Sequence, residues 1–138
     1  MKIFKNIVLK VLMCLVMLLT FTSCKAPAEM CGRYNLTSIS GIPGVSVSTY
    51  EYNYIELNDD YSYTIENKIY GTVTTQTGEW SINDEKTEIT FITKVNASTM
   101  GKDVAQYDYE AKTITLTSKI QNQTISMVLT LQVETDEQ

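Results

Sequence analysis

Thr124-Ile-Ser-Met-Val-Leu-Thr-Leu-Gln-Val133 is the clearest pattern in this chain of 138 residues. Apolar side chains occupy every second position of the stretch: Ile125, Met127, Leu129, Leu131 and Val133. The residues between them are polar, apart from Val128. Because residues two apart share one face of a strand, this period predicts a β-strand with one buried face.

The same period recurs in shorter segments along the chain, with turn-forming residues between them. The further predicted strands are 34–36, 50–57, 61–69, 78–82, 89–95, 106–110 and 113–120, and the predicted turns are 58–60, 83–86, 100–102, 110–112 and 121–123. The apolar face changes within 50–57, which predicts a bulge near Tyr54. We therefore expect an all-β fold, a small antiparallel up-and-down β-barrel of about eight strands, because closure removes exposed strand edges.

The N-terminus has the features of a secretory leader. Three lysines, Lys2, Lys5 and Lys10, precede an apolar run from Val11 to Phe21. The run is followed by Thr22-Ser23-Cys24. The run is shorter than the roughly 20 residues of a membrane-spanning helix. We expect a helical signal peptide over residues 1–23, the lipidated Cys24 with its tether over 24–31, and a β-barrel domain over 32–138.

Thr22-Ser23-Cys24 resembles the lipobox of bacterial lipoproteins, in which small residues precede a cysteine that receives a diacylglyceryl group. The resemblance implies a lipid-anchored protein on the extracytoplasmic face of the cell membrane. An ordinary secreted protein and an uncleaved signal anchor are the alternatives. If Cys24 is not lipidated, it could form a disulfide with Cys31 in an oxidising compartment.

The charge balance argues against two classes of partner. The chain has 11 basic and 16 acidic residues, and loss of Lys2, Lys5 and Lys10 with the leader takes the net charge from −5 to −8. Such a domain lacks the basic stripe that follows a phosphate backbone, so we expect no nucleic-acid binding. It is also not attracted to anionic lipid, so membrane attachment must come from the acyl chains at Cys24.

Three segments resemble bacterial lipocalin-like lipoproteins, which are calycin-type β-barrels. They are Gly32-Arg-Tyr34, the run Tyr54-Ile-Glu-Leu-Asn-Asp-Asp-Tyr-Ser-Tyr63, and Gly78-Glu-Trp-Ser-Ile-Asn-Asp84. The resemblance implies a barrel that holds a small apolar or amphipathic ligand. The chain departs from larger lipocalins because Tyr34 replaces their first-strand tryptophan and no arginine follows Arg33.

The residue types favour binding over catalysis. The chain has no histidine, its cysteines do not cluster, and no carboxylates have calcium-loop spacing, so we expect no enzyme, metal or cofactor. Aromatic side chains in the predicted strands could stack on a ligand while their polar groups orient it. The candidate binding residues are Tyr52, Tyr54, Tyr63, Trp80 and Tyr107.

Three hypotheses follow for the anchored domain. The first is a ligand-binding barrel whose cavity is lined by those aromatic residues. The second is a structural or interaction lipoprotein with a filled barrel, whose outer surface contacts another cell-envelope protein. The third is an inhibitor or chaperone of envelope enzymes, for which residues 40–49 are the candidate protruding loop.

Overall fold

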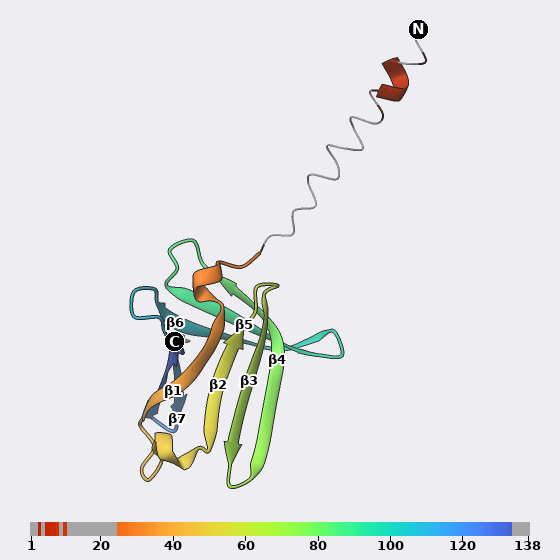
Figure 1. The fold of residues 1–138 in the computed structure, drawn as a ribbon. Helices are drawn as coiled ribbons and strands as arrows, with labels where there is room; N and C mark the ends of the chain where they lie inside the picture. The colour runs from red at the N-terminus through yellow and green to blue at the C-terminus, as the bar shows by residue number, and fades with distance from the viewer. Residues whose placement is uncertain (1–2, 4, 9, 11–24, 134–138) are drawn as a thin grey trace, which may run out of the picture.

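A computed structural model describes residues 3, 5–8, 10 and 25–133 of the chain. The lipidation site and most of the predicted signal peptide lie outside these residues, so the predicted signal helix stays a prediction. Within the described part, no helix is both long enough and apolar enough to cross a membrane. Residues 25–133 form one antiparallel β-barrel (Figure 1).

The barrel has eight strands that follow one another in chain order around its circumference. They are β1 (Gly32–Ser40), β2 (Tyr52–Leu57), β3 (Ser62–Ile69), β4 (Thr72–Ile82), β5 (Glu88–Val95), β6 (Ser98–Asp108), β7 (Thr113–Ile120) and β8 (Gln123–Leu131). Each strand is antiparallel to the next, and β8 pairs with β1 to close the barrel. The predicted all-β, up-and-down barrel is confirmed.

Two local predictions are wrong. Residues 100–102 lie within β6, and the turn before that strand is formed by Asn96 and Ala97. Both residues have positive φ (50° and 63°), as a two-residue hairpin turn of type I′ requires.

The predicted bulge near Tyr54 is absent, because β2 keeps an unbroken register with β3. The tyrosines of β2 occupy its outer face, and this explains the change of apolar face in the sequence. The register shifts lie instead at Thr37 in β1 and Met100 in β6.

One end of the barrel is closed by the segment that precedes β1. A short 3₁₀ helix, η1 (Ala28–Met30), lies across this end (Figure 1). The Met30 side chain is fully buried, and Ala26 is nearly so. The Ala26 amide also donates to Asp59 O at 2.9 Å. Much of the expected tether is therefore packed against the barrel.

Tyr34 connects this closure to the core. Its hydroxyl donates to Met30 O at 2.7 Å and lies 3.4 Å from the Tyr107 hydroxyl. The two rings meet edge to face, with centroids 6.4 Å apart. Burial, and then the hydrogen bond with Tyr107, raise the pKa of Tyr34 far above its ordinary value.

The buried hydrophobic side chains fill the barrel from the closed end to its middle. They are Ala26, Met30, Tyr34, Leu36, Ile55, Leu57, Tyr63, Trp80, Ile89, Phe91, Ala105, Tyr107, Ile114 and Leu129. The opposite end carries the β3–β4, β5–β6 and β7–β8 turns and the long β1–β2 connection, which contains the 3₁₀ helix η2 (Val47–Thr49). We refer to the two ends as the closed end and the open end.

The Tyr34 contact makes stability depend on pH. Below the ordinary tyrosine pKa of 10.0 the phenol is neutral in both folded and unfolded chains. Above that pH the unfolded chain loses the proton and the folded chain keeps it, so the free energy of unfolding falls. Tyr34→Phe should cost about 1 kcal/mol at neutral pH through the lost hydrogen bond, and should make the alkaline fall shallower. Urea unfolding between pH 7 and pH 11 measures both effects.

Tyr70→Phe is the matched control, because Tyr70 is 88% exposed on a turn at the open end. This variant should follow the wild type at every pH. An equally steep alkaline fall in Tyr34→Phe and the wild type would contradict the role given to Tyr34.

Candidate ligand-binding site

The seam between β6 and β7 is incomplete. Three residue pairs join these strands, all beside their connecting turn: Gln106↔Thr115, Tyr107↔Ile114 and Asp108↔Thr113. Beyond them no ladder pair joins the described parts of the two strands, although β6 begins at Ser98 and β7 continues to Ile120. In Figure 1 the β5–β6 hairpin crosses the other strands at a steep angle and its tip projects past β4. The barrel is therefore open along this seam toward the open end.

Charge and strand geometry both favour this separation. Continuing the β6–β7 register would place Lys102 directly opposite Lys119 on the outer face, and like charges in that position destabilise a strand pair. The extra residue at Met100 also bends β6, since a bulge increases local twist. The two strands thus diverge where pairing would be unfavourable.

A cavity of about 260 Å³ lies inside the barrel at this gap. It is lined by Ile65, Gln76, Phe91, Asp103, Val104, Leu116, Thr117, Ser118, Ile125 and Met127. Five of these residues come from the parts of β6 and β7 that are not paired with each other. The volume is just below the roughly 300 Å³ at which ligand pockets usually begin, so the cavity suits a small ligand.

A cluster of polar side chains lies at one side of this cavity. The Gln76 amide donates to the Tyr63 hydroxyl at 3.1 Å and to Thr93 Oγ1 at 2.7 Å. The hydroxyls of Tyr63 and Thr93 are 3.2 Å apart. The Tyr63 ring crosses Gly78, where an added Cβ would lie 2.9 Å from the ring and 2.0 Å from Ile92 O. Glycine at this position therefore leaves the space that Tyr63 needs.

The predicted binding residues do not form one set. Tyr63, Trp80 and Tyr107 all lie inside the barrel and are almost fully buried. Tyr63 packs edge to face on Phe91 at 4.9 Å between ring centroids, and reaches the cavity through Gln76. Trp80 and Tyr107 belong to the core that fills the barrel near its closed end, where Trp80 Nε1 donates to Asn58 O at 3.2 Å.

Tyr52 and Tyr54 lie on the outer face of the barrel, opposite in phase to the buried Ile55 and Leu57. Their rings stack at 5.9 Å, and the Arg33 guanidinium lies 3.9 Å from the Tyr54 ring centroid. The Tyr52 hydroxyl donates to Glu66 at 2.8 Å. The outward aromatic rings therefore already have protein partners and line no part of the cavity.

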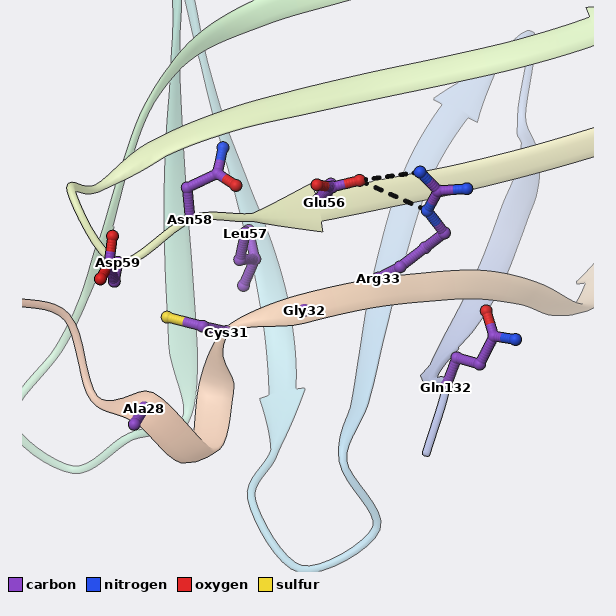
Figure 2. Close-up of a pocket in the computed structure, with 9 residues that line it drawn as sticks. All are labelled: Ala28, Cys31, Gly32, Arg33, Glu56, Leu57, Asn58, Asp59 and Gln132. Carbon is purple, nitrogen blue, oxygen red and sulfur yellow. Dashed lines mark hydrogen bonds and ion pairs between the residues drawn. The ribbon is translucent and has the colours of Figure 1, made fainter. Parts of the chain in front are cut away.

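A second hollow lies on the outside of the closed end (Figure 2). Its volume is about 800 Å³, and it is lined by Ala28, Cys31, Gly32, Arg33, Glu56, Leu57, Asn58, Asp59 and Gln132. Arg33 and Glu56 form an exposed ion pair across it at 3.0 Å. It is a broad surface groove with mainly polar side chains, whereas the cavity at the open end has an apolar wall.

Cys31 lies in this groove with its sulfur toward the Asp59 side (Figure 2). Burial, followed by the carboxylates of Asp59, Glu29 and Asp60, raises the pKa of the thiol. Its Sγ is 3.4 Å from Pro27 O. A protonated thiol without a histidine base is a poor nucleophile. Cys24, the predicted lipidation site, lies outside the described residues.

The part of the chain that the structure describes contains no group of three or more histidine, cysteine or acidic residues placed to hold a metal ion.

Sequence reasoning missed Gln76, Thr93 and Asp103. Gln76 and Asp103 precede the segments in which alternation is obvious, because polar residues occupy both faces there. Counting backward by two from Trp80 reaches Gln76, and from Tyr107 reaches Asp103. This spacing would place both residues on the inner face if the strands continued. The sequence does not show that β4 and β6 extend so far.

Comparison with known proteins gave no match: no family model, no curated protein and no solved structure aligns significantly with this chain.

Proposed function

We propose that this protein is a lipid-anchored extracytoplasmic lipoprotein of lipocalin-like type that binds a small apolar or amphipathic molecule in the open half of its barrel. The observation that carries the proposal is the contrast between the two halves. Met30, Tyr34 and Trp80 fill the closed half, while an apolar cavity remains between β6 and β7. A barrel that only needed stability would gain by completing that seam and filling the space.

The apolar lining of the cavity favours binding of such a ligand through the hydrophobic effect. The apolar wall consists of Ile65, Phe91, Leu116, Ile125 and Met127. Each Å² of apolar ligand surface that this wall removes from water contributes about 25 cal/mol to the free energy of binding. Tyr63, Gln76 and Thr93 add fixed polar groups beside the apolar wall. Binding sites commonly combine a mainly apolar lining with a few oriented polar groups.

The proposed anchor would orient this cavity. Cys24 precedes Ala26 by two residues, a length that spans at most roughly 7 Å. Because Ala26 is packed at the closed end, acyl chains on Cys24 would hold that end beside the membrane. The open end and its cavity would then face away from the bilayer, accessible to molecules in the surrounding aqueous space.

An interaction lipoprotein is the second candidate, favoured by exposed apolar side chains near the open end. Tyr70, Val73 and Ile120 are 88%, 50% and 57% exposed. In that case the turns of the open end would contact another cell-envelope protein, and the cavity would stay empty.

The ligand proposal is tested by native mass spectrometry of the protein purified from its own organism. We expect an extra mass that disappears on denaturation. Ser118→Trp should lower its occupancy at least about tenfold, equivalent to about 1.4 kcal/mol, because Ser118 pairs with Ile125 on the inner face and lines the cavity. Ser81→Trp is the matched control, since Ser81 is exposed and opposite in phase to the buried Trp80. It should retain the extra mass.

A bare mass in repeated preparations of the wild type would contradict the ligand proposal and favour the interaction protein. An extra mass retained equally by Ser118→Trp would place the ligand elsewhere on the molecule.

The anchor is tested separately by detergent-phase partitioning of the full chain expressed in a bacterium. The wild type should enter the detergent phase, and Cys24→Ser should not, because the serine hydroxyl cannot receive the thioether-linked diacylglyceryl group. Cys31→Ser should partition like the wild type. Detergent partitioning of Cys24→Ser equal to that of the wild type would exclude lipidation as the cause of attachment.

A further inference from the structure

The cavity has one charged residue in its lining, Asp103 of β6. Asp103 pairs in register with Phe91, whose side chain is buried inside the barrel, so the two residues lie on the same inner face. The next inward pair along the hairpin, Ile89 and Ala105, is also buried. Asp103 therefore faces the inner side of the sheet, at the solvent-exposed edge of the cavity.

No described cation neutralises Asp103. The four ion pairs among the described residues use Glu29, Glu51, Glu56 and Glu79 as their acids. Lys102 adjoins Asp103 in sequence but, in a strand, points to the opposite face. The cavity lining itself contains no lysine or arginine.

The polar cluster also offers an acceptor. The Gln76 amide nitrogen donates its two hydrogens, one to the Tyr63 hydroxyl and one to Thr93 Oγ1. Gln76 Oε1 is thus left to accept a hydrogen bond. An apolar wall with a carboxylate and an amide oxygen accommodates a head group that carries N–H donors and positive charge. A fatty-acid carboxylate would be repelled by Asp103.

The overall charge acts in the same direction. The domain that remains after loss of the leader lysines carries a net charge of −8. A field of that sign raises the local concentration of cations and lowers that of anions. Local and long-range electrostatics therefore select the same class of molecule.

We propose that the ligand is a small amphipathic amine whose ammonium group pairs with Asp103 while its apolar body lies against Phe91, Leu116 and Met127. This inference rests on the proposed function and specifies its ligand class. Asp103 is exposed on the side of the β6–β7 gap, so water screens the pair. A charge-assisted contact of this kind should raise affinity about 3- to 10-fold.

The test compares three probes that share a hexyl chain and differ in the head group: hexylamine, 1-hexanol and hexanoate. Isothermal titration calorimetry at pH 7 uses the purified full chain in phosphatidylcholine nanodiscs, with empty nanodiscs subtracted. Hexylamine should bind about 3- to 10-fold more tightly than hexanol, and hexanoate should bind most weakly. In Asp103→Asn the preference for the amine should disappear, while hexanol affinity stays unchanged.

Asp84→Asn is the matched control. It removes the same charge from an exposed turn between β4 and β5 at the closed end, and should keep the amine preference. Equal affinities for amine and alcohol in the wild type, or a preference that survives in Asp103→Asn, would overturn the amine proposal and leave the apolar cavity standing. If none of the three probes binds, the proposed function fails as well.

Discussion

The pairing of β1 with β8 is the constraint on which the rest of the structure depends. Six residue pairs join these strands, from Tyr34↔Leu131 to Ser40↔Ser126, and bring the two ends of the sheet together. Without that ladder the meander would be an open sheet with two free edges and one uncovered apolar face. With it, the apolar faces of all eight strands meet inside a barrel, and the chain before β1 is placed over one end as η1.

Closure also determines where the barrel can open. The strands around Met30, Tyr34 and Tyr107 converge on a packed end, and the short β6–β7 ladder holds only that end together. Toward the open end, the bulge at Met100 bends β6 away from β7. Continued pairing there would also place Lys102 opposite Lys119, which is unfavourable. The cavity is thus a consequence of an incomplete seam, and its one charged lining residue, Asp103, comes from the part of β6 that pairs with β5 but not with β7.

Much of the architecture could be predicted from the alternation of apolar residues, because a buried strand face leaves that pattern directly in the sequence. The eight strands and their barrel arrangement follow from it. The extent of β4 and β6 could not be predicted, since residues 72–77 and 98–104 lie toward the open end, where neither face of the strand needs to be apolar. The turn at Asn96-Ala97 was missed for a related reason: the adjacent Gly101 is the more familiar turn residue, but it pairs within the ladder opposite Thr93. The aromatic candidates were chosen by residue type, and type does not distinguish the outward Tyr54 from the inward Tyr63.

A ligand cavity at this position requires the seam between β6 and β7 to be open in solution. Residue-by-residue amide hydrogen exchange measured by NMR tests this most directly. The gap-facing amides of 98–105 and 116–120 should exchange at least about tenfold faster than the amides on the same strands that bond to β5 and β8, because the gap-facing amides have no partner in the barrel. Amides near Tyr107 and Ile114, where the seam is paired, should be protected. Uniform protection along both strands would show a closed seam and would contradict a ligand cavity at this position.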